Sequence, residues 1–142
     1  MVSVQEIFDA AMDLMDEQDE TSGSTNTTDT REYRLRTISI LNMALPALYP
    51  YSGDYDRNAA GRPSPTPLMV DDRADPDFDQ SIPLDDSLCW GLLPFWLASL
   101  LRSGEDTEFS MRMMTEYNKV FADLIDKLPC EFESISMPYG GF

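Results

Sequence analysis

Two stretches in the first third of the chain carry apolar residues with the period of an α-helix. In residues 4–15, apolar positions recur at spacings of three and four, and Ser3 and Glu6 stand where a capping box would begin the helix. A second helix is predicted from about residues 28–30 up to Pro50, because proline stops a helix. The expected apolar positions of the two helices are Val4, Ile7, Phe8, Ala11, Leu14, Met15, Tyr33, Ile38, Leu41, Leu45 and Leu48.

The third predicted helix has almost no polar side. Between Leu88 and Leu101 the only polar residue is Ser99, and Asp85 and Asp86 precede the run as helix-capping residues. Fourteen helical residues span about 21 Å, which is less than the roughly 30 Å hydrocarbon core of a bilayer. A helix that is apolar on all sides and too short to cross a membrane is typical of the buried centre of a helical bundle.

Aromatic and helix-bending residues lie inside this apolar run. Aromatic side chains within an apolar helix are usually core or interface anchors, so we expect Trp90 and Trp96 to be largely buried. Pro94 removes one helical hydrogen bond, and Gly91 lies in the turn before it. The pair predicts either a kink or a close helix crossing at Gly91.

The fourth predicted helix runs from about residue 106 to Leu128, and Pro129 ends it. Ser103-Gly104 forms a tight turn before this helix, so the third and fourth helices should form an antiparallel hairpin. The apolar stripe of the fourth helix consists of Phe109, Met113, Tyr117, Phe121, Leu124 and Leu128.

Together these elements predict one all-α domain over the whole chain, a bundle of about four helices. Residues 18–30 are expected to be a flexible linker, because Ser, Thr, Gly and Asn dominate them. Residues 49–83 form a long proline-rich loop, in which residues 68–70 and 80–84 could pair as a short β-hairpin. Residues 129–142 are expected to be an extended tail.

Charge and composition restrict the classes of function. The chain has 26 acidic and 10 basic residues, no histidine and a net charge of −16. Specific binding to nucleic acid or to an anionic membrane is disfavoured, because both rely on Lys and Arg. Without histidine, a nucleophile elbow or a phosphate-binding glycine loop, we expect neither an enzyme nor a cofactor. The first residues lack the regions of a signal peptide, so an intracellular protein is expected.

Metal and disulfide chemistry receive little support. The run Asp75-x-Asp77-x-Asp79 resembles the start of a calcium loop, but Gln80 stands where an EF-hand requires glycine. A solvated acidic loop is the better interpretation. The two cysteines, at positions 89 and 130, match no zinc-ligand spacing, so no metal site is predicted.

A cluster of arginines is the first part of a candidate interface. Arg31, Arg34 and Arg36 place three of the ten basic residues within two helical turns. They can pair locally with Glu32 and nearby acidic segments, or they can contact an acidic surface of a neighbouring subunit. Contact with a neighbouring subunit would favour assembly into head-to-tail rings.

Methionines and the tail supply the other candidate interface residues. Only part of the cluster that includes Met111 and Met114 can face the core, and methionine suits adaptable partner surfaces. Tyr139 and Phe142 belong to an aromatic, glycine-containing tail that can pack on the bundle or contact a neighbour.

The order of these elements over about residues 31–128 resembles the small head–tail connector (adaptor) proteins of tailed phages and prophages. In that family the Ile-Pro-Leu-Asp-Asp element opens the central helix, and the next helix carries a Phe…Tyr stripe. The matching features are the Arg-rich helix ending Leu-Pro-Ala-Leu-Tyr-Pro, Ile82-Pro-Leu-Asp-Asp86, the apolar helix, the turn Ser103-Gly-Glu-Asp106 and the stripe from Phe109 to Tyr117.

The resemblance implies a structural virion protein that assembles as a ring between portal and tail. Its partners would be other copies of itself, the portal protein and tail-completion proteins, and DNA would pass without specific binding. It would lie at the head–tail junction after assembly in the host cytoplasm, with no membrane involved.

One alternative remains from the residues themselves. An acidic inhibitory protein, such as a DNA mimic that occupies a basic cleft, would also carry this charge. Its carboxylates should then lie on rigid helices at phosphate-like spacing. Many of the carboxylates here lie in segments expected to be loops, including residues 16–20 and 71–79.

Overall fold

The computed structural model describes residues 1–16, 21, 23–25, 27–52, 67–70 and 75–127. This part of the chain is helical, as predicted, and holds no strand. Its elements are α1 (Val4–Met15), α2 (Arg31–Leu48), the short 3-10 helix η1 (Tyr49–Tyr51), α3 (Asp86–Leu101) and α4 (Thr107–Lys127).

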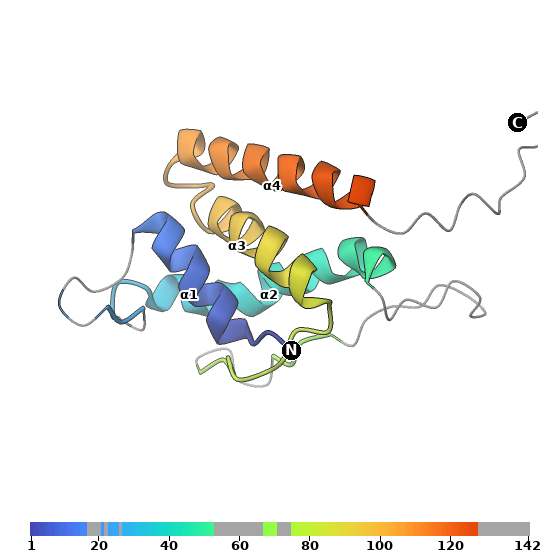
Figure 1. Cartoon of the computed structure of the whole chain (residues 1–142). Helices are drawn as coiled ribbons and strands as arrows, with labels where there is room; N and C mark the ends of the chain where they lie inside the picture. The colour runs from blue at the N-terminus through green and yellow to red at the C-terminus, as the bar shows by residue number, and fades with distance from the viewer. Residues whose placement is uncertain (17–20, 22, 26, 53–66, 71–74, 128–142) are drawn as a thin grey trace, which may run out of the picture.

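Helix α3 lies in the middle of the molecule, with α4 on one side and with α1 and α2 on the other (Figure 1). It packs against all three of the other α-helices, which explains why its sequence has no polar side. The apolar run therefore forms the centre of the bundle, as the pattern predicts. Its buried residues are Leu88, Cys89, Leu92, Leu93, Pro94, Leu97, Ala98, Ser99 and Leu101.

Helix α1 begins at the predicted cap. The Ser3 hydroxyl accepts a hydrogen bond from the Glu6 backbone N–H and donates one to the Glu6 carboxylate, both at 3.2 Å. The predicted apolar stripe is wrong at one position, because Leu14 is 37% exposed while Met12 is fully buried. At about 100° per residue, Leu14 lies roughly a quarter-turn from the middle of the buried face, and Met12 lies closer to that middle.

The start of α3 differs in detail from the prediction. Asp85 occupies the N-cap position, but its side chain makes no capping hydrogen bond. Its carboxylate instead accepts a hydrogen bond from the Ser52 hydroxyl at 3.1 Å, which ties the end of η1 to the start of α3. Pro94 lies inside the continuous helix. A Cβ atom built on Gly91 would lie 3.5 Å from Val120 Cγ1, so the glycine sits at the crossing with α4.

Helices α3 and α4 form the predicted hairpin. The Asp106 carboxylate accepts a hydrogen bond from the Phe109 backbone N–H at 3.1 Å and so caps α4. Ser99 and Ser110 join the helices reciprocally, because each hydroxyl donates to the other residue's carbonyl, at 3.0 and 2.8 Å. The small serine side chains let the two backbones come close together.

The β-hairpin considered for residues 68–70 and 80–84 is absent from the described part of the chain. Ser81 forms an isolated antiparallel bridge with Ser3 instead. The Val4 N–H donates to the Gln80 carbonyl at 3.0 Å, and the Ile82 N–H donates to the Val2 carbonyl at 2.8 Å. The backbone groups of Gln80 and Ile82 thus pair with the start of the chain and not with residues 67–70. Residues 67–70 are held by side chains instead.

Two side-chain amides hold residues 67–70. Asn42 donates to the Leu68 carbonyl at 3.1 Å and accepts from the Leu68 N–H at 2.8 Å. Gln80 makes the same pair of bonds with Met69, at 2.9 and 2.6 Å. These clamps imitate strand pairing, and they place the Leu68 side chain in the core at 6% exposure.

The two tryptophans do not share one environment. The prediction of burial is wrong for Trp90, which lies in the first turns of α3 and is 47% exposed. Trp96 is half-buried, donates to the Ile40 carbonyl at 3.3 Å and packs beside Tyr117, with ring centroids 5.5 Å apart. An all-apolar helix does not reveal which of its sides a neighbour covers.

Candidate functional site

The arginine cluster of α2 divides between structural and exposed roles. Arg36 donates to the carbonyl of Leu101, the last residue of α3, at 3.1 Å. A cation at this position satisfies an open carbonyl and opposes the negative end of the helix dipole. Its Nη2 also lies 3.9 Å from the Glu32 carboxylate, so the local pairing considered for the cluster is present at Arg36.

Arg34 lies against aromatic rings. Its guanidinium carbon is 4.1 Å from the Phe78 ring centroid and 5.4 Å from that of Phe8. One N–H donates to the Gln5 side-chain carbonyl at 3.3 Å. Burial lowers the pKa of Arg34, although the nearby carboxylates of Asp9 and Asp75 oppose this shift. Arg34 is therefore a cation held partly out of water by packing.

Arg31 is exposed at the first turn of α2 and borders the same hollow as Arg34. This Arg31–Arg34 pocket measures about 330 Å³, and Thr27, Thr28 and Asp75 also line it. Among the described residues, no carboxylate lies within 4.0 Å of either guanidinium. Within the described residues, these two neighbouring arginines therefore have no carboxylate close enough for an ion pair.

The loop before α2 gives the pocket its wall. Thr30 stands at the N-cap of α2 but makes no side-chain capping bond. Its hydroxyl donates to the buried Thr25 carbonyl at 2.6 Å and accepts from the Thr27 N–H at 3.0 Å. Thr25 in turn donates to the Asp9 carboxylate at 2.5 Å, which fastens the loop to α1.

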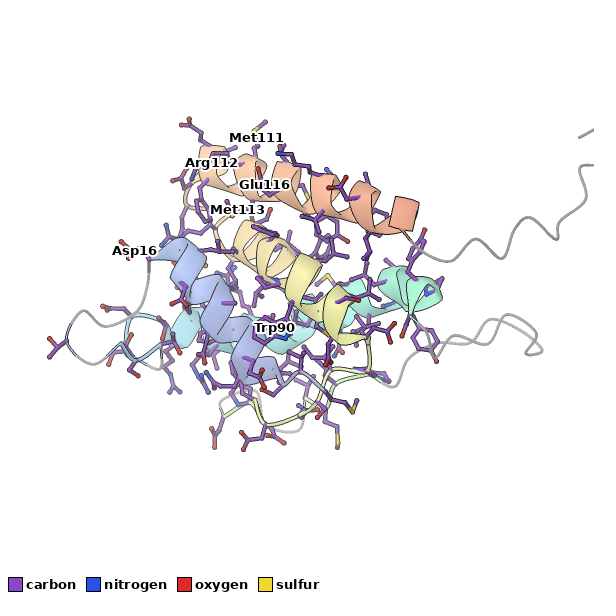
Figure 2. The ribbon with its side chains drawn as sticks, viewed as in Figure 1. Asp16, Trp90, Met111, Arg112, Met113 and Glu116 are labelled. Carbon is purple, nitrogen blue, oxygen red and sulfur yellow. The ribbon has the colours of Figure 1, made fainter. Side chains whose placement is uncertain are left out.

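The predicted methionine surface lies on α4, across α3 from the arginines (Figure 2). Met111 points away from the bundle and is 66% exposed. Met114 is half-buried, while Met113 faces inward with 8% exposure. The other two candidate interface residues, Tyr139 and Phe142, lie outside the described residues.

A second hollow of about 330 Å³ lies along α2 and the end of α3. It is mostly apolar, and Met43 beside it is 64% exposed. It brings no nucleophile together with a base. Its lining consists of Arg36, Ser39, Ile40, Met43 and Leu100.

Two features bear on catalytic and metal chemistry. Burial raises the pKa of the Cys89 thiol to about 12, so this thiol is protonated at neutral pH and is a poor nucleophile. The Asp77 carboxylate accepts a hydrogen bond from the Asp79 N–H at 3.0 Å, which is a local turn contact. Within the described segments no group of three His, Cys, Asp or Glu side chains is arranged to hold a metal ion.

The sequence did not single out the threonines and Asp75 as neighbours of the arginine cluster. Thr27 and Thr28 directly precede the cluster, which was an available signal. Asp75 comes from a distant loop, and only the folded structure brings it to the pocket.

None of the described helices has the length and hydropathy needed to cross a membrane. Comparison of the chain with known protein families, with curated proteins and with solved structures finds no match.

Proposed function

We propose that this chain is a structural subunit of a phage or prophage head–tail connector, which assembles as a ring between portal and tail. The observation that carries the proposal is the position of the helix that follows Ile82-Pro-Leu-Asp-Asp86. This helix, α3, is the central element of the bundle. The resemblance assigns the same place to the corresponding helix of the connector family.

The hairpin partner of α3 also fits the proposal. Helix α4 packs antiparallel on α3 through the Phe109–Tyr117 stripe, in which Phe109 and Tyr117 contact the core. Its other side carries exposed residues such as Met111 and Arg112. An exposed helix face opposite the α1–α2 side supplies the two different surfaces that a ring contact requires.

The negative charge of the chain supports a role in which the protein lies next to DNA but does not bind it. A net charge of −16 repels phosphates, so DNA can move past such a ring without adhering. In this role the protein assembles with portal and tail-completion proteins at the head–tail junction of the virion, after synthesis in the host cytoplasm, and performs no catalysis.

Light scattering of the purified protein across concentration and salt tests the proposal. A connector subunit should form a discrete particle of roughly a dozen copies, because a closed head-to-tail contact has a defined end point. Electron microscopy of that particle should then show a ring with an open channel.

A monomer at every concentration would contradict self-assembly. The acidic inhibitor would then be the better candidate, and it predicts tight binding to a basic protein. Open-ended aggregates with no defined mass would also contradict the proposal, because a ring contact closes.

A further inference from the structure

We propose that residues 128–142 of this chain fold back along a strip of half-buried aromatic rings and fill the apolar hollow between α2 and the end of α3. The inference does not depend on the connector proposal, because the contact lies within one chain. The rings of this aromatic strip are those of Tyr51, Phe121, Tyr117 and Trp96.

The rings of the aromatic strip follow one another without a break. Tyr51 packs edge-on against Phe121, with ring centroids 5.3 Å apart. Phe121 stacks on Tyr117 at 6.0 Å, and Tyr117 lies 5.5 Å from Trp96. The strip leads to the apolar hollow, because the Trp96 N–H donates at 3.3 Å to the carbonyl of Ile40, which lines that hollow.

The aromatic strip and the apolar hollow are partly open to solvent. Among the described α-helices, α4 packs extensively against α3 alone, so its flank toward α2 is left without a helix neighbour. The four rings of the strip are each half-buried. At the far end, Met43 is 64% exposed beside the hollow of about 330 Å³. Large apolar side chains that gather in one accessible patch mark a contact surface.

Residues 128–142 have the sequence pattern of an extended segment with one apolar face. The apolar residues of this segment are Leu128, Cys130, Phe132, Ile135, Met137, Tyr139 and Phe142. They recur at spacings of two and three, and residues two apart on an extended chain face the same side. Pro129 and Pro138 disfavour a helix. The segment therefore offers a row of apolar side chains to a narrow apolar surface.

The segment is attached at the near end of the aromatic strip. Helix α4 ends at Lys127, and Phe121 lies closer to this end than Tyr117 does. The six residues from Phe121 to Lys127 span about 9 Å of helix. The fifteen residues of the segment reach up to about 50 Å when extended. Since neighbouring rings of the strip are at most 6.0 Å apart, the segment is long enough to reach the hollow.

Other occupants suit the aromatic strip less well. Residues 53–66 begin two residues after Tyr51, but Tyr55 is their only large apolar residue. A second copy would bring a net charge of −16 against an equal charge. A segment of the same chain avoids that approach, and its tether gives it a high local concentration.

Paramagnetic NMR on the full chain tests the docking. In the variant Cys130→Ser with Ser134→Cys, a nitroxide label at position 134 should remove most of the intensity of the Met43 and Leu100 methyl signals, which come from the hollow. Position 134 lies between apolar positions of the segment, so the label points away from the groove. The buried Cys89 thiol reacts slowly and stays unlabelled during a brief reaction.

Ile135→Glu and Ser136→Glu form a matched pair, because they place the same charge at neighbouring positions on opposite faces of the segment. Ile135→Glu should weaken docking at least about tenfold and restore both methyl signals, since burial of an isoleucine side chain contributes more than that factor. Ser136→Glu should leave the loss of signal unchanged. Circular dichroism should show native helix content in both variants.

Three results would overturn the inference. The first is full Met43 and Leu100 methyl intensity in the nitroxide-labelled protein. The second is equal behaviour of Ile135→Glu and Ser136→Glu, because the apolar face would then not make the contact. The third comes from mixing nitroxide-labelled chains with isotope-labelled chains that carry no nitroxide: signal loss as strong as in the doubly labelled chain would place the segment of another copy in the hollow. Particle mass does not enter this assay, so the connector proposal and this inference fail independently.

Discussion

Replacing Asn42 by aspartate tests the amide clamp that holds residues 67–70. The substitution keeps the shape of the side chain and the bond from the Leu68 N–H, which is 2.8 Å long. It changes the other bond, because an Asn42 N–H donor 3.1 Å from the Leu68 carbonyl becomes a carboxylate oxygen. Two acceptors then face each other where a donor and an acceptor stood.

The expected cost follows from the lost bond and the repulsion. A hydrogen bond contributes about 0.5–1.5 kcal/mol, and a half-buried carbonyl left without a donor costs about 1–3 kcal/mol. We expect a loss of about 2 kcal/mol for the docking of this segment. That is a roughly 30-fold shift in its opening equilibrium, because 1.36 kcal/mol corresponds to a factor of ten.

Hydrogen exchange measured by NMR is the assay. In Asn42→Asp the Leu68 amide should exchange about 30-fold faster than in the unaltered protein at the same pH, whereas amides in the middle of α3 should change much less. Acidification should reverse the difference, because a protonated carboxyl group can donate to the Leu68 carbonyl again. Gln80→Glu should have a smaller effect, since its bonds to Met69 are exposed.

Asn118→Asp is the control, because it makes the same chemical change at an exposed position on α4. It should leave exchange at Leu68 unchanged. Unaltered Leu68 exchange in Asn42→Asp, or an equal acceleration in the control, would refute the clamp.

Three further predictions concern the core and the helix crossing. Leu97→Ala, at a fully buried position of α3, should lower the free energy of unfolding by about 2–5 kcal/mol in urea titrations. Leu14→Ala, at a position that is 37% exposed, should lower it by less than about 1.5 kcal/mol. Equal losses in the two variants would contradict the assigned buried face of α1. Gly91→Ala should leave thermal stability unchanged or raise it by up to about 1 kcal/mol, because alanine favours the helix and its Cβ would meet α4 at an ordinary 3.5 Å; a clear loss would show a tighter crossing than described. In a Cys130→Ser background, the Cys89 thiol should react about a thousandfold more slowly with a thiol reagent at pH 8 than in denatured protein, because burial raises its pKa from 9.0 to about 12. The raised pKa of Cys89 stabilises the fold fully below pH 9, and this contribution is lost as the pH rises toward 12. A native thiol that reacts rapidly, or a free energy of unfolding that stays constant over that pH range, would contradict the burial of Cys89.

The helices were predictable because local chemistry determines them. Ser3 and Pro50 mark helix ends through the hydrogen bonds that they offer or lack, and the spacing of apolar residues identifies the face that packs. The position of α3 was predictable from its lack of a polar side. The sequence did not predict which side of α3 is left uncovered, because every side of this helix is equally apolar. For that reason Trp90 was wrongly expected to be buried.

The candidate site was predictable only in part. Proximity in sequence placed the three arginines together on one helix, but it did not separate the cap at Arg36 from the pocket at Arg31 and Arg34. That separation depends on Phe78 and Leu101, which reach α2 through tertiary packing. The pairing of Ser81 with Ser3 was missed for the same reason, because contacts between distant residues leave no local pattern.

Because two arginines cap helix ends, the basic residues of this protein are harder to replace during evolution than its acidic residues. Arg36 caps α3, and Arg102 donates to the Met15 carbonyl at the end of α1, at 3.1 Å. Carboxylates on the solvent side of the bundle can be gained or lost by drift at small cost in stability. Replacing either capping arginine removes the donor from a carbonyl at a helix end. The acidity of the surface is therefore free to vary, whereas the basic content has a lower limit imposed by folding.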